Sequence, residues 1–235
     1  MAVKRVKTTK LDIIKCAAEF FFEYGYAGTS PRMISDALDL STGNITYYFP
    51  SKEHLLAVFV EMLCEYQWKM MEEEAQEGVS SILAVCLELT TMAAVCEQDP
   101  IAKEFYLSSY SSPLCLDIIR RNDAERNKKV FKDYCPEWSD EQFAEAEVLV
   151  SGIEYATLMT AGDPVSLETR ISGALNNILS IYNVPEEVRA RMLRKVFALN
   201  YRSISKRMMR KFKEYIKETN EQALELAQQK KGAIQ

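Results

Sequence analysis

The sequence has few of the residues that metal sites and disulfide frameworks require. It contains one histidine, His54, and six cysteines in 235 residues. Zinc sites usually combine cysteine and histidine ligands at short spacing, whereas these cysteines form no close pairs. We therefore expect no metal, and we interpret the cysteines as reduced, mostly buried thiols: Cys16, Cys64, Cys86, Cys96, Cys115 and Cys135.

Long apolar runs are also missing from the chain. A membrane-spanning helix needs about 18 or more consecutive apolar residues, and no such run occurs in the sequence. The basic N-terminus leads into an amphipathic pattern rather than into the apolar core of a signal peptide. We therefore expect a cytoplasmic protein that does not associate with membranes.

Paired carboxylates at a defined spacing, nucleophile motifs and glycine-rich phosphate loops are absent as well. These are the patterns by which an enzyme reveals its chemistry in a sequence, so we expect no enzyme and no cofactor. With 48% hydrophobic residues and only eight glycines, the chain is long enough for a small module and one larger helical domain.

Basic residues are not in excess, because 34 acidic residues against 29 basic ones give a net charge of −5. A DNA-binding protein needs positive charge where it faces the duplex rather than in total. The N-terminal arm carries Lys4, Arg5, Lys7 and Lys10, which could follow phosphates or enter a minor groove. A solvated arm without contacts is the equal alternative.

Residues 29 to 52 predict two short helices joined by a tight turn. Pro31 follows two hydroxyl residues, which is a helix start, and the first helix is expected to end near Leu38. Asp39 and Leu40 then form the turn, and Ser41 is a suitable N-cap for the second helix. Such a pair usually serves to place the second helix in a DNA groove.

The second helix begins with small and polar residues, which favour close approach to a partner over burial. Ile45 and Phe49, four residues apart, would hold the helix on its own domain. Pro50 ends it, and Lys52 follows where a phosphate could also meet free backbone N–H groups. The predicted DNA-binding residues are Thr29, Arg32, Ser41, Thr42, Gly43, Asn44, Thr46, Tyr47, Tyr48 and Lys52, of which Tyr48 could equally pack in the core.

The preceding segment completes a three-helix unit over residues 9 to 50. Apolar residues recur there at helical spacing from Ile13 to Tyr24, and Gly25 is a plausible C-cap. Over residues 8 to 60 the pattern resembles the DNA-binding domain of the TetR family of bacterial transcription regulators. The matching residues are Phe20, Tyr24, Gly25, Thr29, Ser30, Ile34, Ser41, Gly43, Ile45, Tyr47, Tyr48, Phe49, Lys52 and Leu55.

Two residues depart from the family's pattern. Asp39 stands where glycine is usual, and an aspartate adopts a left-handed conformation only at a cost. Thr46 stands where the family favours an aromatic residue, so Tyr47 could replace its contact. The operator preference of relatives therefore does not carry over. Because helix-turn-helix spacing also occurs in proteins that never bind DNA, a helical protein-interaction module without sequence-specific DNA binding is the alternative.

The rest of the sequence predicts further helices almost to its end, so we expect an all-α chain. The predicted helices lie at residues 51–76, 79–97, 100–110, 113–134, 139–161 and 166–182, with the last ones over 185–229. The expected domains are a DNA-binding domain over residues 1–53 and a larger helical domain over residues 54–235.

A single recognition helix contacts too few bases for selective binding, so two copies are expected to pair across a palindromic DNA operator. The TetR resemblance implies a repressor that forms a homodimer through two helices of the C-terminal half and is released from the DNA by a small-molecule effector. The best candidates are residues 140–162 and 166–182, which could alternatively pack only within the chain. Their small and apolar residues include Gly152, Ala156, Gly173, Ala174 and Leu175.

The resemblance also implies an effector pocket in the helical domain. Its predicted lining is Met92, Phe105, Tyr106, Tyr110, Phe131, Trp138, Tyr155 and Met159, although each could be plain core. Glu88 and Glu154 lie in otherwise apolar helices, where an unpaired carboxylate is costly. Either one of them meets a cationic ligand, or they are hydrogen-bonded or tilted toward solvent.

The last predicted helix carries a basic face. Arg202, Lys206, Arg210, Lys213 and Lys217 share this face, and an apolar stripe runs from Ile204 to Tyr215. The face could touch DNA, an acidic partner or a membrane surface. A helix that packs its stripe and leaves its charges in water is the simpler interpretation.

Overall fold

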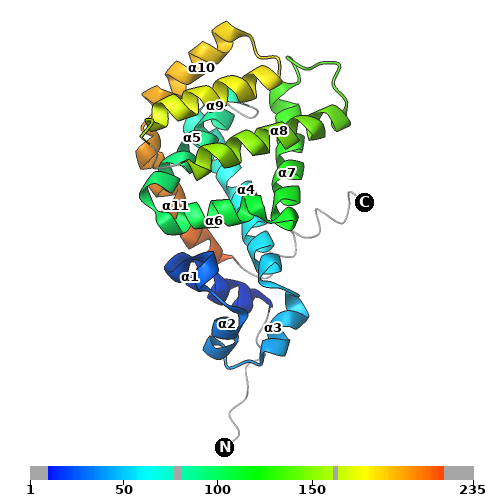
Figure 1. Cartoon of the computed structure of the whole chain (residues 1–235), viewed down its shortest axis with the longest axis vertical. Helices are drawn as coiled ribbons and strands as arrows, with labels where there is room; N and C mark the ends of the chain where they lie inside the picture. The colour runs from blue at the N-terminus through cyan, green and yellow to red at the C-terminus, as the bar shows by residue number, and fades with distance from the viewer. Residues whose placement is uncertain (1–9, 77–80, 161–163, 220–235) are drawn as a thin grey trace, which may run out of the picture.

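The computed structural model describes residues 10–76, 81–160 and 164–219, and within them it consists of eleven helices and no strand. Three helices form a small unit at one end, and the other eight form the body above it (Figure 1). This arrangement confirms the all-α class predicted from the sequence. Among the described residues, no helix is both long and apolar enough to span a membrane.

The small unit consists of α1 (Lys10–Gly28), α2 (Pro31–Ala37) and α3 (Thr42–Tyr48). Its core is formed by apolar residues that the helical period places on the inner face of each helix. These are Ile13, Ile14, Ala17, Phe21, Ile34, Ile45 and Phe49, all nearly inaccessible to solvent. Ser30 caps α2 by accepting a hydrogen bond from the backbone N–H of Met33.

The helix α1 does not end at Gly25, as the sequence predicts, but continues to Gly28 across a kink. Gly25 adopts φ 78° and ψ 170°, a conformation that residues with a Cβ rarely adopt. The Glu104 carboxylate from the body lies against this kink, where it accepts a hydrogen bond from the Ala27 N–H. A Cβ at position 25 would overlap this carboxylate.

The helix α4 (Lys52–Ala75) runs from the small unit into the body (Figure 1). The predicted domain boundary after residue 53 lies in its first turn, so a continuous helix joins the two parts. The helix ends at Gln76, which adopts a left-handed conformation with φ 52°. Gly78, which the sequence suggests as the helix breaker, lies outside the described residues.

The centre of the body is α5 (Ile82–Gln98), which is buried on all sides from Leu83 to Cys96, as its apolar sequence predicts. Around it lie α6 (Pro100–Ser111), α7 (Pro113–Phe131), α8 (Asp140–Met159), α9 (Leu167–Ile181), α10 (Glu186–Ala198) and α11 (Tyr201–Glu218). Asp99 caps α6 by accepting from two backbone N–H groups, and Ser139 with Gln142 forms a capping box on α8.

The helix α11 packs as its apolar stripe predicts. Ile204, Met208 and Phe212 are buried, and the Phe212 ring meets Phe22 of α1 edge to face at 6.2 Å. The Lys213 ammonium lies over the Phe22 ring, whereas Arg202, Lys206, Arg210 and Lys217 are exposed. The stripe therefore fastens α11 to the small unit as well as to the body.

All six cysteines are free thiols, as expected. Cys86, Cys96, Cys115 and Cys135 are buried, and burial raises the pKa of the Cys96 thiol to about 12. These thiols therefore behave as apolar core side chains.

We expect Gly25→Ala to lower the free energy of unfolding by about 1 to 3 kcal/mol, because alanine strains this conformation and its methyl group meets Glu104. Urea unfolding followed by circular dichroism measures the change. Gly173→Ala is the contrast: a Cβ there meets no atom within 4 Å and alanine favours a helix, so this change should not lower the free energy of unfolding of the protomer. Equal stability of Gly25→Ala and the unmodified chain would contradict this account of the kink.

Candidate functional site

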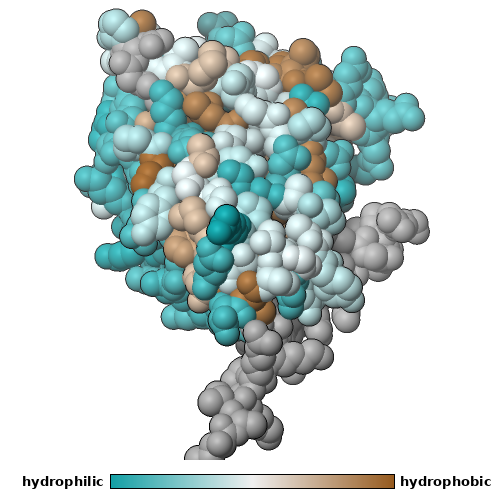
Figure 2. Space-filling model, turned by 60° about the horizontal axis from the view of Figure 1, so that its bottom comes forward, coloured by the Kyte–Doolittle hydropathy of each residue, from teal (hydrophilic) through white to brown (hydrophobic). Residues whose placement is uncertain are grey.

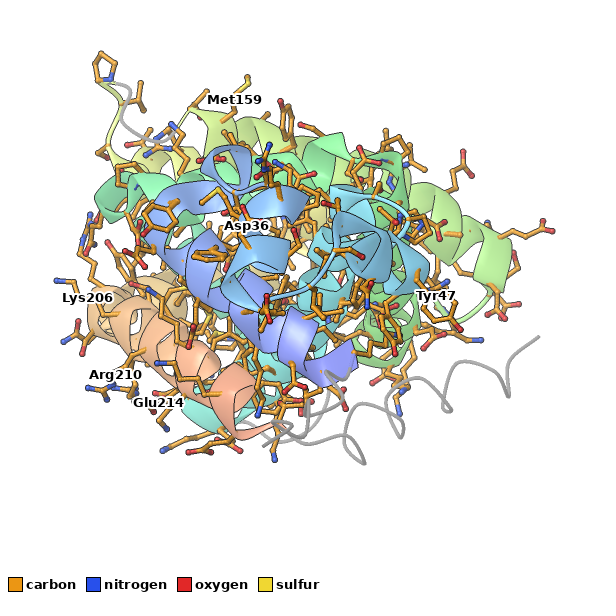
Figure 3. The ribbon with its side chains drawn as sticks, turned by 90° about the horizontal axis from the view of Figure 1, so that it is seen from below. Asp36, Tyr47, Met159, Lys206, Arg210 and Glu214 are labelled. Atoms are coloured by element: carbon orange, nitrogen blue, oxygen red, sulfur yellow. The ribbon has the colours of Figure 1, made fainter. Side chains whose placement is uncertain are left out.

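The helix α3 presents a polar outer surface on a rigid base. Ile45 and Phe49 anchor it, since both are at most 3% exposed. The outer residues Ser41, Thr42, Gly43, Asn44 and Thr46 are exposed, and the Tyr47 side chain is 81% exposed. Seen from below, Tyr47 projects from the edge of the molecule (Figure 3). An exposed polar helix held by a buried apolar face is suited to contact a large partner.

The turn between α2 and α3 has the left-handed residue that the sequence indicates. Asp39 adopts φ 52°, in the region that the family usually fills with glycine. The following Leu40 N–H donates to the Ser35 carbonyl oxygen at 2.9 Å, and this hydrogen bond closes the turn. The aspartate is therefore accommodated, and the two helices keep a fixed relative position.

Ser41 stands at the N-cap of α3, but its side chain does not cap the helix. Its Oγ donates to Asn44 Oδ1 at 2.6 Å, and no backbone N–H bonds to it. The capping role expected for this hydroxyl is therefore wrong. Asn44 needs both its oxygen and its nitrogen to contact an adenine edge bidentately, so this hydrogen bond would have to open for such a contact.

Two predicted DNA-binding residues lie inside the small unit. Thr29 is 1% exposed and donates to the Gly25 carbonyl oxygen at 2.8 Å. The Lys52 ammonium donates to the carbonyl oxygens of Tyr26 and Thr29 at 2.8 and 3.0 Å and lies over the Tyr26 ring. Desolvation lowers the pKa of Lys52. In this structure its charge is used to hold the end of α1.

The remaining candidates are distributed around α3. Arg32 is exposed, and its Nε lies 3.7 Å from an Asp36 carboxylate oxygen, a surface pair that contributes little to stability. Tyr48 is half-buried, with its ring edge to face with Tyr47 at 5.1 Å. Lys10 lies over the Phe49 ring, while the rest of the basic arm lies outside the described residues.

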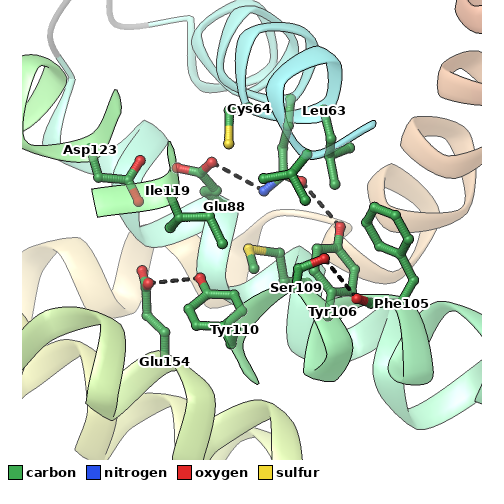
Figure 4. Close-up of a pocket in the computed structure, with 13 residues that line it drawn as sticks. Leu63, Cys64, Glu88, Phe105, Tyr106, Ser109, Tyr110, Ile119, Asp123 and Glu154 are labelled. Atoms are coloured by element: carbon green, nitrogen blue, oxygen red, sulfur yellow. Dashed lines mark hydrogen bonds between the residues drawn. The ribbon is translucent and has the colours of Figure 1, made fainter. Parts of the chain in front are cut away.

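A second candidate site lies inside the body, where α4, α5, α6, α7 and α8 enclose a cavity of about 30 Å³ (Figure 4). This volume has room for about one water molecule, so the cavity is small. The lining comprises Val60, Leu63, Cys64, Gln67, Glu88, Met92, Phe105, Tyr106, Ser109, Tyr110, Ile119, Asp123 and Glu154.

Six of the ten predicted pocket residues line this cavity, and four do not. Phe131 is buried elsewhere and stacks on Tyr182 with ring centres 4.2 Å apart, and Trp138 packs against the same tyrosine. Tyr155 is half-buried and Met159 is half-exposed, both away from the cavity. The sequence predicts these four as lining because they are aromatic or sulfur-containing residues of segments expected to be central helices. That property does not fix the direction of a side chain.

Gln67 and Asp123 also line the cavity, although the sequence pattern does not single them out. Gln67 accepts a hydrogen bond from the Tyr106 hydroxyl and donates one to Glu88, both at 3.1 Å. A signal was present, since Gln67 interrupts the apolar face of α4 between Leu63 and Met70. A polar residue on an otherwise apolar helix face, such as Gln67 or Glu88, thus indicates a polar group inside the body.

A buried ion-pair network forms one side of the cavity. The Arg126 guanidinium lies 2.8 Å from a Glu88 oxygen and 2.9 Å from an Asp123 oxygen, and it stacks over the Trp68 ring at 4.4 Å. Burial raises the pKa of Glu88 to about 7, although Arg126 opposes the shift. Glu88 is therefore an ion-paired and hydrogen-bonded carboxylate, one of the two alternatives the sequence left open.

The surroundings of Glu154 differ from those of Glu88. Its Oε2 accepts a hydrogen bond from the Tyr110 hydroxyl at 2.8 Å, and within the described part of the chain no lysine or arginine forms an ion pair with it. Burial raises its pKa well above the ordinary value, and the Asp123 and Glu147 carboxylates add to the shift. No group of three His, Cys, Asp or Glu among the described residues is placed to hold a metal ion.

The neighbouring Glu147 is fully buried beside this network. Its Oε1 accepts from Asn127 at 2.7 Å and from the Tyr182 hydroxyl, while Oε2 has no hydrogen-bond partner among the described residues. Burial raises the pKa of Glu147 to about 7. The folded chain thus retains a proton there that the unfolded chain releases near pH 4.5.

We expect this proton to make the free energy of unfolding fall as the pH rises from about 4.5 to about 7. Glu147→Gln should remove this contribution and gain on the order of 2 to 3 kcal/mol relative to the unmodified chain between pH 5 and pH 8. Urea unfolding at several pH values measures the difference. Glu145→Gln, an exposed change on the same helix, is the control, and parallel pH profiles of the unmodified chain and Glu147→Gln would refute the prediction.

The outer surface of α8 and α9 is formed by small and apolar residues. Val148 and Leu149 are 50% and 59% exposed, and Gly152 and Gly173 have open space where a Cβ would stand. Leu149, Ile153, Asn177, Ser180 and Ile181 line a groove between the two helices. Ala174 and Leu175, which the sequence offers for pairing, are buried in the core of the chain instead.

Comparison with known proteins assigns residues 13–58 to the bacterial regulatory proteins of the tetR family. The probable HTH-type transcriptional regulator YttP of Bacillus subtilis (strain 168) is 40% identical over 58 residues, which cover 23% of this chain and 28% of that protein. The match therefore spans less than a third of the relative's length and is confined to one segment of each protein.

A solved structure extends the likeness to the body. SmeT, the repressor of the Stenotrophomonas maltophilia multidrug efflux pump SmeDEF, aligns with 78% of this chain and 98% of its own at a TM-score of 0.51 and 17% identity. At this identity the likeness shows a shared fold. The helical body and the small unit together thus have a known counterpart.

Proposed function

We propose that this chain, whose residues 13–58 belong to the tetR family of bacterial regulatory proteins, is a transcription regulator that binds double-stranded DNA and responds to a small molecule. The observation that carries the proposal is the outer surface of α3. It is polar and exposed, and buried Ile45 and Phe49 hold it in place.

The residues that would read base edges are those on the exposed outer face of α3. Asn44 and Tyr47 carry the side chains that reach furthest among them. Arg32 would contact phosphates, and Lys52 would act indirectly by holding the end of α1. Phosphate contacts set affinity and base contacts set selectivity, so the two groups have separable effects.

We further propose that two copies pair through the outer surface of α8 and α9. An exposed apolar stripe of Val148, Leu149, Ala156 and Met159 follows one face of α8. The glycines beside it permit close approach of helices. Pairing would cover this apolar surface and would place two α3 helices on successive half-sites of a palindromic operator.

The helix α6 would couple the cavity to the DNA-reading unit. Phe105, Tyr106 and Tyr110 of α6 line the cavity, and Glu104 of the same helix bonds to the kink of α1. The cavity is too small for any effector larger than water, so an effector would have to displace these side chains. Displacement of α6 would move α1 and with it α3, which favours release of the DNA as the response.

Fluorescence anisotropy on the DNA upstream of the chain's own gene tests DNA binding. We expect selective binding whose logarithmic salt slope is about −0.9 per phosphate contacted. Asn44→Ala and Tyr47→Ala should each change discrimination between related operators by about 1 to 3 kcal/mol. Lys206→Ala is the control, because Lys206 lies on the side of the molecule opposite Tyr47 in the view from below (Figure 3).

A chain that binds all DNA sequences alike, or none, would overturn the regulator in favour of a protein-interaction module. The lower face of the molecule supports the DNA hypothesis over an apolar interface, since hydrophobic residues occur there in separate groups among hydrophilic ones (Figure 2). An unchanged discrimination in both α3 variants would instead mean that another surface reads the bases.

Sedimentation equilibrium tests the pairing. We expect the unmodified chain to sediment as a dimer of the 26.9 kDa protomer and Leu149→Glu to sediment as a monomer, because the new charge would be buried unpaired. Leu114→Glu is the matched control, since Leu114 is also exposed but lies at the start of α7. Dissociation of both variants, or of neither, would show that α8 is not the interface.

A further inference from the structure

We propose that the cavity, opened by displacement of its lining side chains, binds an organic cation with an aromatic or apolar body and that the Glu154 carboxylate is its counter-ion. This inference rests on the effector response proposed above and names the chemical class of the effector. Two independent properties of the cavity support it: the nature of its walls and the balance of its charges.

The walls are those of a site for an apolar body. Phe105, Tyr106 and Tyr110 from α6 face Leu63 from α4 and Met92 from α5. Aromatic rings attract cations through their faces, and this attraction grows when water is excluded. Figure 4 shows the Tyr110 ring between Glu154 and the other aromatic residues, so one ligand could contact a ring and the carboxylate together.

The charges of the lining are not balanced. Glu88, Asp123 and Glu154 reach the cavity from three helices, and Arg126 is the guanidinium that pairs with the first two. Glu154 is left with the Tyr110 hydroxyl as its partner, and a hydroxyl carries no compensating charge. A positive charge from a ligand would complete this network.

Other ligand classes fit the charges less well. An anion entering the cavity would meet three carboxylates, and both terminal nitrogens of Arg126 are already engaged. The stacking of Arg126 on Trp68 also holds it away from a new partner. A neutral ligand would leave the proton on Glu154 and would gain no electrostatic energy from it.

The network also predicts that cation binding releases a proton. Glu154 faces Tyr110 of α6, Glu88 of α5, Asp123 and Arg126 of α7, and Glu147 of α8. The burial and carboxylates that raise its pKa keep a proton on it while the cavity is empty. A fixed positive charge would take the place of that proton, which leaves to solvent, so affinity should rise with pH.

Isothermal titration calorimetry of the full chain tests the inference with three probes that share a phenyl group. They are benzyltrimethylammonium, the anion 3-phenylpropionate and the neutral 3-phenylpropanol. We expect the cation to bind at least tenfold more tightly than the other two. We also expect its dissociation constant to fall between pH 6 and pH 8 and its apparent enthalpy to differ between phosphate and Tris buffers.

The variant Glu154→Gln should weaken cation binding at least tenfold and abolish its pH dependence. Its amide oxygen can still accept from Tyr110, so the fold should persist. Glu145→Gln removes an equal charge from the exposed side of the same helix and should leave binding unchanged. Equal binding of the three probes, or an unchanged dissociation constant in Glu154→Gln, would overturn the cation site.

The DNA measurement separates this failure from failure of the proposed function. A chain that binds DNA selectively but does not prefer the cation refutes the cation site alone. A chain that prefers the cation, loses this preference in Glu154→Gln and binds no DNA supports the cation site and refutes the regulator.

Discussion

The contact between Glu104 and the kink of α1 is the interaction on which the arrangement of the two parts depends. The left-handed backbone of Gly25 turns the end of α1 so that the Ala27 N–H meets the carboxylate of a body helix. Lys52 holds the same end from the first turn of α4. A hydrogen bond from α6 and a half-buried ammonium from α4 therefore hold α1 relative to the body. In the proposed response, these contacts would transmit a movement of α6 to the small unit.

The interior of the body differs from an ordinary core because it contains more acid than base. Glu88, Asp123, Glu147 and Glu154 are gathered around Arg126, in a region where unpaired charge is expensive. The chain tolerates this by ion pairing two carboxylates and by burying the others, which raises their pKa values. Such an arrangement lowers the free energy of unfolding. The binding of a ligand that supplies a compensating positive charge would be a physical reason to keep it.

The exposed faces of α3 and α8 differ in their chemistry. Polar side chains dominate the exposed face of α3, while apolar and small ones occupy the exposed face of α8. The basic residues of α11 lie apart from Tyr47, and their helix is held by its apolar stripe against α1. This stripe adds a second mechanical link between the body and the small unit, in addition to Glu104. That the exposed charges on α11 remain in water stays a prediction.

The sequence by itself determined the helices and the three-helix unit, because helical period, proline and capping residues act over only a few neighbouring residues. Asp39 in the turn and the buried α5 could be predicted for the same reason. Tertiary structure alone decided which side chains share the cavity, so that Gln67 and Asp123 line it while Phe131 and Trp138 pack elsewhere. It also turned Thr29 and Lys52 inward and brought Glu104 to Gly25, some eighty residues away along the chain. The direction of a side chain depends on how whole helices pack, and that packing is not encoded in any local pattern.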